Sequence, residues 1–535
     1  MNRVLNFLII ILLLLVALSC SSANHLGCNK KDLSPYNFGL AAAKNGEERF
    51  NVLLKTHNAA VAAGVNVDYT GIDTIRLEIP AKPSCIPLTQ YNDFKGCVFV
   101  VTNYSEDCYL YEKRVEGTPI YVEKKYIDAG DFRMVDSLRS GRFLMIVEDE
   151  NLWVQNRRGF SYGHSRKDIL LIENGVAINS VVMPYNNAYS KPKCSYVRQG
   201  KEPLVIKNIK IERAPNCTFL THIAKIAGIN GVRFSNVSIH TPPSTLIDDR
   251  GINIYNCTTV TMNNVRIEGS YSQSNHSGYG ICLDNVWNFH ARHLYGKANW
   301  GIFGNNNVNK ACIEESQINR FDIHCYGKDI SFRDVAFFDL YNQYSSVYGT
   351  IRYDRCTFTN FVPVQNGGSY NSFVEHEVVM NDCVFNATPN KSYVLNIRQL
   401  NEGKNARYEL AQKCLPNVYI KNLMVNMTDG ADRFYLFYCM PSDKGVSDID
   451  YLSNISIDGL TINPEGEKNI KEMLLSNISI ITVHPVNCKL KNVQVCQPAT
   501  MIRGTSDKNI VQLKTNITID GGKVMMKNVR NLRQQ

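Results

Sequence analysis

The chain has 535 residues and a formal net charge of +9, and 44% of its residues are hydrophobic while 20% are charged. The moderate excess of positive charge favours an acidic partner, and because no nucleic-acid-binding module is recognisable, we expect no nucleic acid among its partners. Outside the N-terminal segment no stretch is long and apolar enough for a membrane-spanning helix, which argues against a helical integral membrane protein.

The N-terminus has the pattern of an export signal. Arg3 supplies a positive charge, and the apolar run at residues 7–18 is too short for a comfortable membrane span. The run ends in Ala-Leu-Ser-Cys20, which resembles the lipobox of bacterial lipoproteins. The resemblance implies that residues 1–19 are a signal peptide and that Cys20 is acylated. With residues 20–35 as a polar tether, we expect a protein anchored by lipid to the bacterial outer membrane, at the cell surface or on the periplasmic face.

An amphipathic helix is predicted at residues 47–64, where Gly64 would end it. Its apolar face would consist of Val52, Leu53, Ala60 and Ala63. Such a helix suits the end of a solenoid, because the first coil of a solenoid exposes an apolar cross-section that needs a cap. Short strands are predicted next, at residues 74–79 and 97–101. Residues 105–200 are less regular, and we expect longer coils with irregular loops over the side of the fold.

A short pattern recurs from residue 206 onward, at intervals of roughly 20 to 30 residues, the range of solenoid repeats. It reads apolar, any, Asn/Asp/Gly, apolar, any, apolar. The clean copies are residues 206–211, 234–239, 262–267, 332–337, 380–385, 420–425, 457–462, 490–495 and 519–521. Degenerate copies fill the gaps at residues 289–294, 313–318 and 353–358.

Each copy predicts two short strands joined by a sharp corner. Alternating apolar residues point inward in a strand, while Asn, Asp and Gly tolerate the left-handed backbone that a corner needs. Asn side chains stacked in successive coils can also bond one another. An antiparallel sandwich would need hairpin turns every 8–12 residues or so, and those signals are missing. The sequence therefore predicts an all-β protein, a right-handed parallel β-helix over residues 36–535 in a single domain.

The 17 cysteines would suggest disulfides in an exported protein. Cys356 and Cys383, however, occupy the same slot of the repeat as Val237, so we expect them to be small inward-facing hydrophobic residues. Which other cysteines pair between neighbouring coils stays open.

The candidate site lies at residues 320–326. Strand alternation places Arg320, Asp322, His324 and Tyr326 together on the outside, with Phe, Ile and Cys between them facing inward. Ordinary surfaces prefer Lys, Glu, Ser and Thr, so this group is unusual for a solvated face. The alternative is a structural polar ladder, which we consider the weaker interpretation.

Stacking of neighbouring coils extends this site. We align the inward isoleucines Ile281, Ile302, Ile323 and Ile351. The alignment places His324 between Phe303 and Arg352, and it places Tyr326 beside Asn305, within side-chain reach. A slip of one residue would turn these side chains inward.

The site resembles the active face of β-helix polysaccharide lyases, and the chain resembles the surface lipoproteins of that superfold that cleave uronic-acid glycans such as chondroitin sulfate and hyaluronan. The resemblance implies β-elimination on an acidic polysaccharide, pectin-like glycans included. Arg352 and Asn305 would neutralise the uronate carboxylate, His324 would be the base, Tyr326 the acid, and Asp322 would orient His324. We expect the protein to act as a monomer.

No cofactor is certain from the sequence and the need for a metal stays open, because we find no convincing cluster of acidic ligands. Ca²⁺, which some β-helix lyases use, would have Glu148, Asp149 and Glu150 as its only candidates. Consecutive strand residues alternate faces, so this triplet is a poor site.

A second basic and aromatic patch is a candidate for substrate binding, because Arg can clamp carboxylate or sulfate groups while aromatic rings stack on sugars. It consists of Arg157, Arg158, Tyr162, His164, Arg166 and Lys167. The equal alternative is a solvated edge of the fold with no binding role. Tyr162 and His164 are also rivals for the acid and base. One coil before His324, Asn299 and Trp300 are further binding candidates, although an inward Trp300 is an equal alternative.

Two other functions remain open. A glycoside hydrolase on the same fold needs paired carboxylates, which Asp284, Asp322 and Asp354 would supply if they stack on the outside. A non-catalytic glycan-binding rod is the other alternative, because a fold does not fix a function.

Overall fold

The computed structural model covers the whole chain, and our description is confined to the following residues: 31–79, 85–102, 109–154, 164–181, 192–214, 222–241, 250–269, 279–298, 300–345, 347–366, 376–398, 416–428, 430–431, 433–440, 454–464, 472–478, 486–495, 500–504, 515–520, 525–527 and 533–534. The predicted signal peptide and Cys20 lie outside these residues. Among the described helices, none is both long and apolar enough to cross a lipid bilayer.

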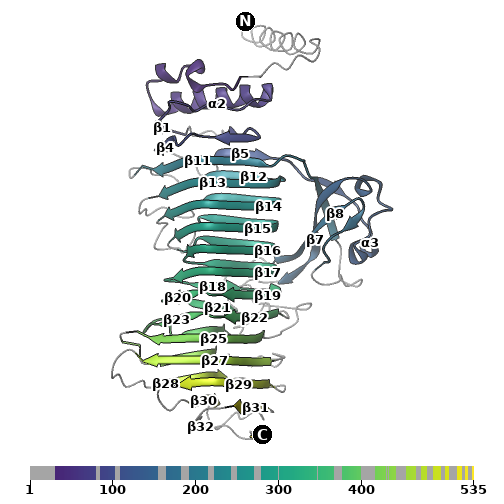
Figure 1. Cartoon of the computed structure of the whole chain (residues 1–535). Helices are drawn as coiled ribbons and strands as arrows, with labels where there is room; N and C mark the ends of the chain where they lie inside the picture. Colours follow the sequence, from purple (N-terminus) through teal and green to yellow (C-terminus); the bar gives the residue numbers. More distant parts are fainter. Residues whose placement is uncertain are drawn as a thin grey trace.

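The chain forms a long rod of stacked coils, as Figure 1 shows, and the predicted all-β parallel β-helix is confirmed. The strands of its large sheet are β1 (Thr74–Leu77), β2 (Ile86–Pro87), β3 (Tyr91–Asp93), β4 (Val98–Val101), β5 (Tyr109–Arg114), β11 (Leu204–Arg213), β12 (His222–Ala227), β13 (Asn230–Thr241), β14 (Arg250–Gly269), β15 (Ile281–Ala298), β16 (Phe303–Ile318), β17 (Phe321–Phe338), β18 (Tyr341–Tyr344), β19 (Val347–Asp354), β20 (Thr357–Thr359), β21 (Val362–Asn366), β22 (His376–Asn381), β23 (Val384–Ala387), β24 (Tyr393–Arg398), β25 (Asn417–Met427), β26 (Arg433–Met440), β27 (Asn454–Pro464), β28 (Glu472–Ile478), β29 (Val486–Val495), β30 (Thr500–Gly504), β31 (Thr515–Asp520), β32 (Met525–Lys527) and β33 (Arg533–Gln534). Each coil pairs in parallel with the next, as in the register Val237 to Val265 between β13 and β14.

The corners of the coils are formed by the repeat residues, as predicted. Asn208, Asn236 and Asn264 all have left-handed backbones, with φ of 56°, 53° and 54°. They also bond one another along the rod, because Asn236 Nδ2 donates to Asn208 Oδ1 at 2.9 Å and Asn264 Nδ2 donates to Asn236 Oδ1 at 2.8 Å. One residue type therefore serves both the turn and the stacking of coils.

Replacing Asn236 by alanine is expected to lower the melting temperature more than replacing it by glycine. Both variants lose the two ladder bonds, but only alanine also has to hold a left-handed backbone, at a cost of roughly 1–2 kcal/mol. Thermal unfolding of the two variants beside the parent measures the difference. Equal losses in the two variants would mean that the corner conformation contributes nothing beyond the hydrogen bonds.

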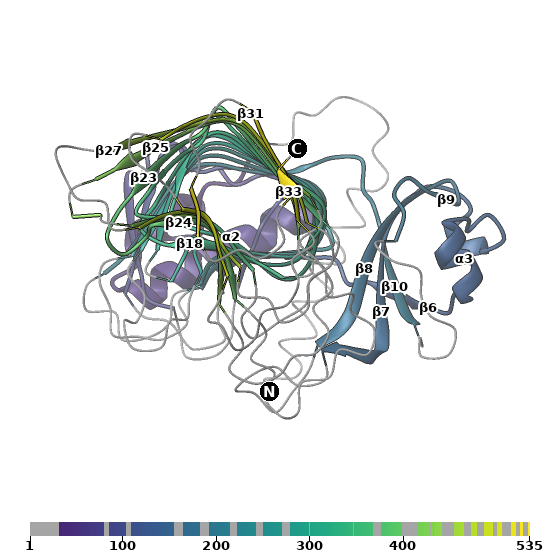
Figure 2. The same ribbon diagram turned by 90° about the horizontal axis from the view of Figure 1, so that it is seen from below.

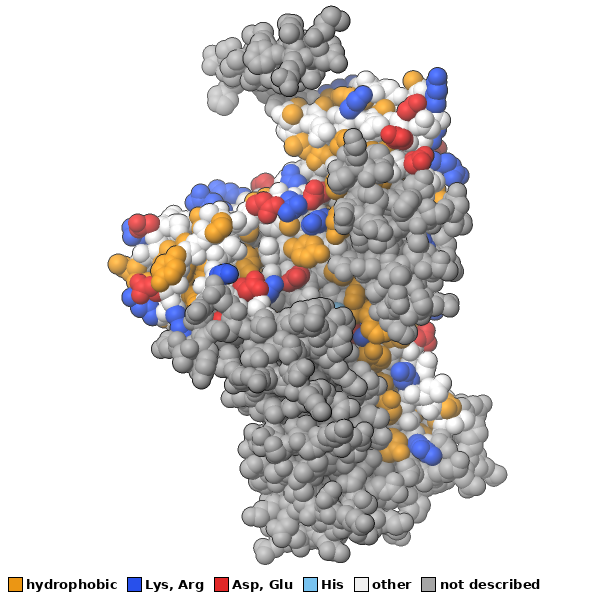
Figure 3. Space-filling model, turned by 180° about the vertical axis from the view of Figure 1, so that it is seen from behind, with side chains coloured by type: hydrophobic (Ala, Val, Ile, Leu, Met, Phe, Trp, Pro, Cys, Tyr) orange, Lys and Arg blue, Asp and Glu red, His pale blue; other side chains and the backbone are white. Residues whose placement is uncertain are grey.

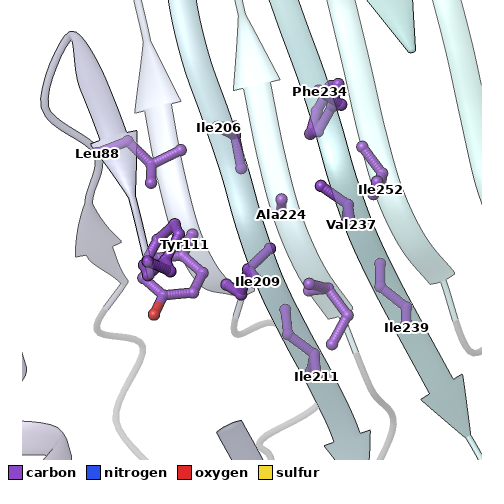
Figure 4. A pocket seen from close by; sticks show the side chains of 12 residues that line it. Leu88, Tyr111, Ile206, Ile209, Ile211, Ala224, Phe234, Val237, Ile239 and Ile252 are labelled. Atoms are coloured by element: carbon purple, nitrogen blue, oxygen red, sulfur yellow. The ribbon is translucent and has the colours of Figure 1, made fainter. Parts of the chain in front are cut away.

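The interior of the rod is apolar. Cys356 and Cys383 are buried in it and are free thiols, as their place in the repeat predicts. Near the N-terminal end of the rod, a small cavity lies between side chains such as Leu88, Tyr111 and Ile252 (Figure 4). Since its lining is almost wholly apolar, we regard it as a packing gap in the core; a binding site would need polar groups to orient a ligand.

The N-terminal cap is the predicted helix, α2 (Gly46–Ala63), preceded by the short 3₁₀ helices η1 (Pro35–Phe38) and η2 (Leu40–Ala42). Asn45 caps α2 by accepting from the Glu48 amide, and Gly64 ends it with φ of 63°. The buried face comprises Phe50, Leu53, Thr56, His57 and Ala60. The predicted face is thus correct for Leu53 and Ala60, whereas Ala63 is exposed and Val52 only half-buried. In Figure 1 the helix lies across the end of the rod, where a solenoid cap is needed.

Much of the predicted loop region 105–200 is a separate module, and here the structure differs from the sequence analysis. An antiparallel sheet in the order β6-β10-β7-β8-β9 packs against two short helices around its own core. The elements are β6 (Thr118–Ile120), α3 (Lys124–Ala129), η3 (Asp136–Leu138), β7 (Arg142–Val154), β8 (His164–Glu173), β9 (Val176–Ala177) and β10 (Pro192–Arg198).

The module stands beside the rod (Figures 1 and 2), and its described surface mixes acidic and basic side chains (Figure 3). It contacts the rod through β7 and β8, which meet coils β14 to β17. Leu144, Ile146 and Ile169 of its sheet pack with Trp287 on the outside of β15. Irregular spacing in the sequence therefore marks an inserted domain-like element on one side of the β-helix.

Candidate functional site

The site centres on a β-bulge in β17. Asn305 of β16 pairs with Ile323 and Asn306 pairs with Cys325, so His324 is an extra residue of β17, inserted between these two pairs. A bulge re-aims a side chain and is often found beside active sites. The predicted stacking is wrong here, because Phe303 pairs with Phe321 and with Ile281, so His324 does not lie between Phe303 and Arg352.

His324 is hydrogen-bonded to a tyrosine that the sequence analysis did not single out. The Tyr279 hydroxyl lies 2.8 Å from His324 Nε2, and the two rings are 5.5 Å apart between centroids. Trp300 Nε1 donates to the same hydroxyl at 2.7 Å. Trp300 therefore belongs to the outer site and is absent from the core cluster, which decides between the two alternatives left open for it.

Behind this pair lies a buried ion pair. Arg320 Nη2 is 2.5 Å from Asp322 Oδ2, and the two side chains are 2% and 0% exposed. Arg320 Nη1 donates to the Trp300 carbonyl at 2.7 Å, and the guanidinium lies between the rings of Trp300 and Tyr341 at 4.3 and 4.2 Å. The predicted outward cluster is therefore present, but Arg320 and Asp322 are covered by aromatic side chains and do not meet solvent.

Two glycines make room for this arrangement. A Cβ on Gly304 would lie 2.4 Å from Tyr279 Cδ2, and a Cβ on Gly301 would lie 2.3 Å from Arg320 Cδ. Gly301 also has φ of 144°, which side chains disfavour. Because Gly304 stands between the coil of Tyr279 and that of Asp322, its missing side chain lets the tyrosine ring lie over it and reach His324.

The protonation states follow from burial and charge. Burial acts to raise the pKa of Asp322, but the attraction of Arg320 and the hydrogen bond with His324 outweigh it, so the pKa lies below its ordinary value. Burial, with Asp322 nearby, raises the pKa of Tyr279 well above its ordinary value. Asp322 Oδ2 is 3.3 Å from the Tyr279 hydroxyl and 3.6 Å from His324 Nε2. The site thus holds a carboxylate, a neutral phenol and an imidazole in contact.

Three predicted catalytic residues, Asn305, Arg352 and Tyr326, are not part of this group. Asn305 is fully buried between Leu283 and Ile323, so it faces inward and not outward. Arg352 pairs with Ser331 in the register and contacts Asp354 at 3.5 Å, so it lies elsewhere on the rod.

Tyr326 is a corner residue, in contrast to its predicted place beside Asn305. Its φ is 61°, and it occupies the corner that Asn285 and Asn307 form in the preceding coils. It is 5% exposed, and its hydroxyl donates to the Ser165 carbonyl at 2.7 Å. Tyr326 therefore joins the rod to the end of the β7–β8 hairpin at which β8 begins.

This contact brings part of the predicted substrate-binding patch to the site, because β8 carries His164, Arg166 and Lys167. Lys167 lies 3.6 Å from Glu148 and interacts electrostatically with Asp284 of β15. The side chains of His164 and Arg166 are outside our description. So are the remaining members of the patch, Arg157, Arg158 and Tyr162, and the separate binding candidate Asn299.

The three carboxylates that a glycoside hydrolase would use in pairs do not lie together. Asp284 pairs with Asn306 and Asp354 with Arg333, so these residues do not stack with Asp322. For the Ca²⁺ candidates, Glu148 is half-exposed and Asp149 is 1% exposed, in keeping with alternate faces of one strand.

A sequence signal for Tyr279 did exist. Gly304 occupies an outward position within a strand, where a glycine often marks the close approach of another group. Tyr279 stands just before the strand of the preceding coil, and the two positions are adjacent only in the folded register.

Comparison with known proteins gives a fold likeness only. No family model and no curated protein sequence matches the chain. Among solved structures it is similar to the tailspike of Pseudomonas phage phi297, with a TM-score of 0.49, 12% identity and coverage of 92% of this chain and 84% of the tailspike. The tailspike of Pseudomonas phage LKA1 gives a TM-score of 0.47, 12% identity and coverage of 91% and 84%. The tailspike of Acinetobacter baumannii bacteriophage AP22, in complex with A. baumannii capsular saccharide, gives a TM-score of 0.44, 11% identity and coverage of 85% of this chain and 79% of the tailspike. At these values the similarity carries no inference about activity.

Proposed function

We propose that the protein is a polysaccharide lyase that cleaves an acidic, uronic-acid-containing glycan by β-elimination. The observation that carries the proposal is the hydrogen bond of 2.8 Å between the Tyr279 hydroxyl and His324 Nε2, formed at a bulge on the outside of the rod. His324 is 17% exposed and Tyr279 is half-buried, so a bound sugar has access to both, while Asp322 behind them is 0% exposed.

His324 takes the C5 proton of the uronate, the electrons of that bond form the C4=C5 double bond, and the C4–O4 bond breaks. The leaving O4 takes the Tyr279 proton. The raised pKa keeps Tyr279 in its neutral phenol form, which suits an acid. The hydrogen bond between the two residues then returns the proton from imidazolium to phenolate, which resets the site.

This pair also predicts stereochemistry. Because an acid and a base in direct contact approach the substrate from one side, the C5 proton and O4 must leave from the same face of the ring. They lie on the same face in a 4-linked glucuronate and on opposite faces in a galacturonate. We therefore favour glucuronate-containing glycans, such as chondroitin and hyaluronan, over pectin-like chains.

The uronate carboxylate also needs a cation. Arg320 is buried and paired with Asp322, so its charge is already compensated. Lys167, brought to this side of the rod by β8 and 33% exposed, is our candidate. Replacing Lys167 by methionine is expected to lower kcat/KM by about 10²-fold while the Tm stays near that of the parent, measured with the assay below. An unchanged kcat/KM would exclude this role.

The deciding assay follows ultraviolet absorbance from the C4=C5 double bond. The protein is incubated with hyaluronan, chondroitin and polygalacturonate, and reducing ends are counted in parallel. Absorbance from the first two but not the third is the expected result. Absorbance only from polygalacturonate would contradict the same-face assignment. New reducing ends without absorbance would replace elimination by hydrolysis, and binding without either would make the protein a glycan-binding rod.

Hydrolysis is the second candidate because of Asp284. Its Oδ1 is buried with no hydrogen-bond partner among the described residues, and burial raises its pKa, as expected for a general acid. Glu148 interacts with it electrostatically and is half-exposed, as a general base would be. In that case Asp284→Asn and not His324→Ala would remove the activity.

The N-terminal sequence is the basis for a proposal on where in the cell the protein acts. We propose that acylated Cys20 holds the protein at the bacterial outer membrane, within reach of an external glycan. Fractionation of cells that express the parent or the Cys20→Ala variant tests the anchor. Release of that variant into the soluble fraction is expected, and retention in the membrane would refute it.

A further inference from the structure

A second group of reactive side chains lies on a different part of the coils from Tyr279 and His324. His290 of β15 and Cys312 of β16 are direct neighbours in the register, and Glu314 follows Cys312 by two residues on the same strand. These residues come after the corners at Asn288 and Lys310, whereas the Tyr279–His324 site comes before the first corner of its coil. The group is therefore separate from the proposed active site.

We propose that His290, Cys312 and Glu314 bind a zinc ion. Their ligand atoms, one nitrogen, one sulfur and one carboxylate oxygen, all lie within 4.8 Å of one another. Zinc takes such a mixed set, with bonds of about 2.0–2.3 Å, so the ligand atoms around it would stand roughly 3.3–3.7 Å apart. His290 Nε2 and Glu314 Oε2 are already 3.1 Å apart, and rotation of the Cys312 side chain completes the set.

The surroundings orient these ligands. Arg333 contacts Glu314 through Oε1, which leaves Oε2 turned toward His290. An outer partner that fixes a carboxylate in this way is typical of metal sites. The simple alternative is a surface ion pair between His290 and Glu314, but that pair gives no reason for a half-buried thiol beside it.

Three protein ligands leave a fourth position open, as in zinc sites that bind water or substrate. His290 is 44% exposed, so the open position would be accessible to solvent. The sequence offered only Glu148, Asp149 and Glu150 as metal candidates, since His290 lies more than 20 residues before Cys312 and Glu314. Only the coil-to-coil register brings them together.

Cobalt provides the test, since a thiolate bound to Co²⁺ gives an intense charge-transfer absorption in addition to weaker visible bands. The purified full chain is stripped with a chelator and titrated with Co²⁺, which is then displaced by Zn²⁺. We expect one equivalent of Co²⁺ to bind with the thiolate band. Cys312→Ser should lose that band, and Glu314→Gln should weaken Zn²⁺ binding by at least about 100-fold, the upper range for loss of an outer partner alone.

Cys282→Ser is the matched control. Cys282 is another half-buried cysteine on the outside of β15, but it lies before the corner at Asn285, away from the group. It should retain the cobalt spectrum and the zinc affinity of the parent. Absence of stoichiometric binding by the parent, or an unchanged spectrum in Cys312→Ser, would overturn the proposal. Neither outcome depends on lyase activity.

Discussion

Replacing His324 by alanine is expected to lower the rate of unsaturated product formation by roughly 10²–10⁴-fold, the usual contribution of a general base. The melting temperature should hardly change. His324 is partly exposed, and the Tyr279 hydroxyl keeps Trp300 and Asp322 as partners when the imidazole is gone. Initial rates of absorbance increase, together with thermal unfolding of parent and variant, measure the two effects.

Tyr279→Phe tests the other half of the pair, because it keeps the ring over Gly304 and removes only the proton donor. A similar loss of rate is expected. His293→Asn is the matched control. His293 is a half-exposed corner histidine with φ of 54°, which asparagine tolerates, and its partner is Glu315. Its activity should equal that of the parent. Full activity in His324→Ala would instead direct attention to His164 on the neighbouring hairpin.

The fold was predictable because successive coils form their corners and their interior with the same residue types. Few residue types readily adopt the left-handed backbone of a corner. An Asn between apolar positions, such as Asn236 or Asn264, therefore marks a corner. The module was not predictable from the repeat, since antiparallel strands such as β7 and β8 carry no corner signature. The rod also tolerates such an insertion without any change in its own pattern.

The site was predictable in composition and not in geometry. Residues 320–326 stood out because their outward side chains are unlike a surface. Their partners, however, depend on register. Ile281 pairs with Phe303 and not with Ile302, and the extra residue at His324 then shifts every neighbour that follows it. An alignment by isoleucines could not reveal that Phe303 pairs with Phe321. It therefore gave Asn305 and Arg352 roles that their positions do not support.

Replacing Arg320 by methionine is expected to destabilise the coils around β17 by about 3–5 kcal/mol near neutral pH, because it leaves the Asp322 carboxylate buried without its counter-ion. Methionine keeps much of the packing between Trp300 and Tyr341, so the loss of stability measures the effect of removing the Arg320 charge. Thermal unfolding and local hydrogen exchange measure it. The double variant Arg320→Met/Asp322→Asn should recover much of the stability, since it removes the unpaired charge as well.

The pH dependence provides an independent check with a definite sign. The pKa of Asp322 is depressed in the folded parent. The stability that its ionised carboxylate contributes is therefore fully present above the unfolded-state pKa of about 3.9 and is lost as pH falls through the folded-state pKa. Without Arg320, burial dominates and raises the pKa of Asp322, so the carboxyl becomes neutral at a higher pH than in the parent. The stability gap between parent and Arg320→Met should therefore narrow as the pH is lowered from 7 toward roughly 4. A gap that stays constant over this range would mean that Arg320 acts through packing alone, and that Asp322 is not the fixed negative charge beside His324.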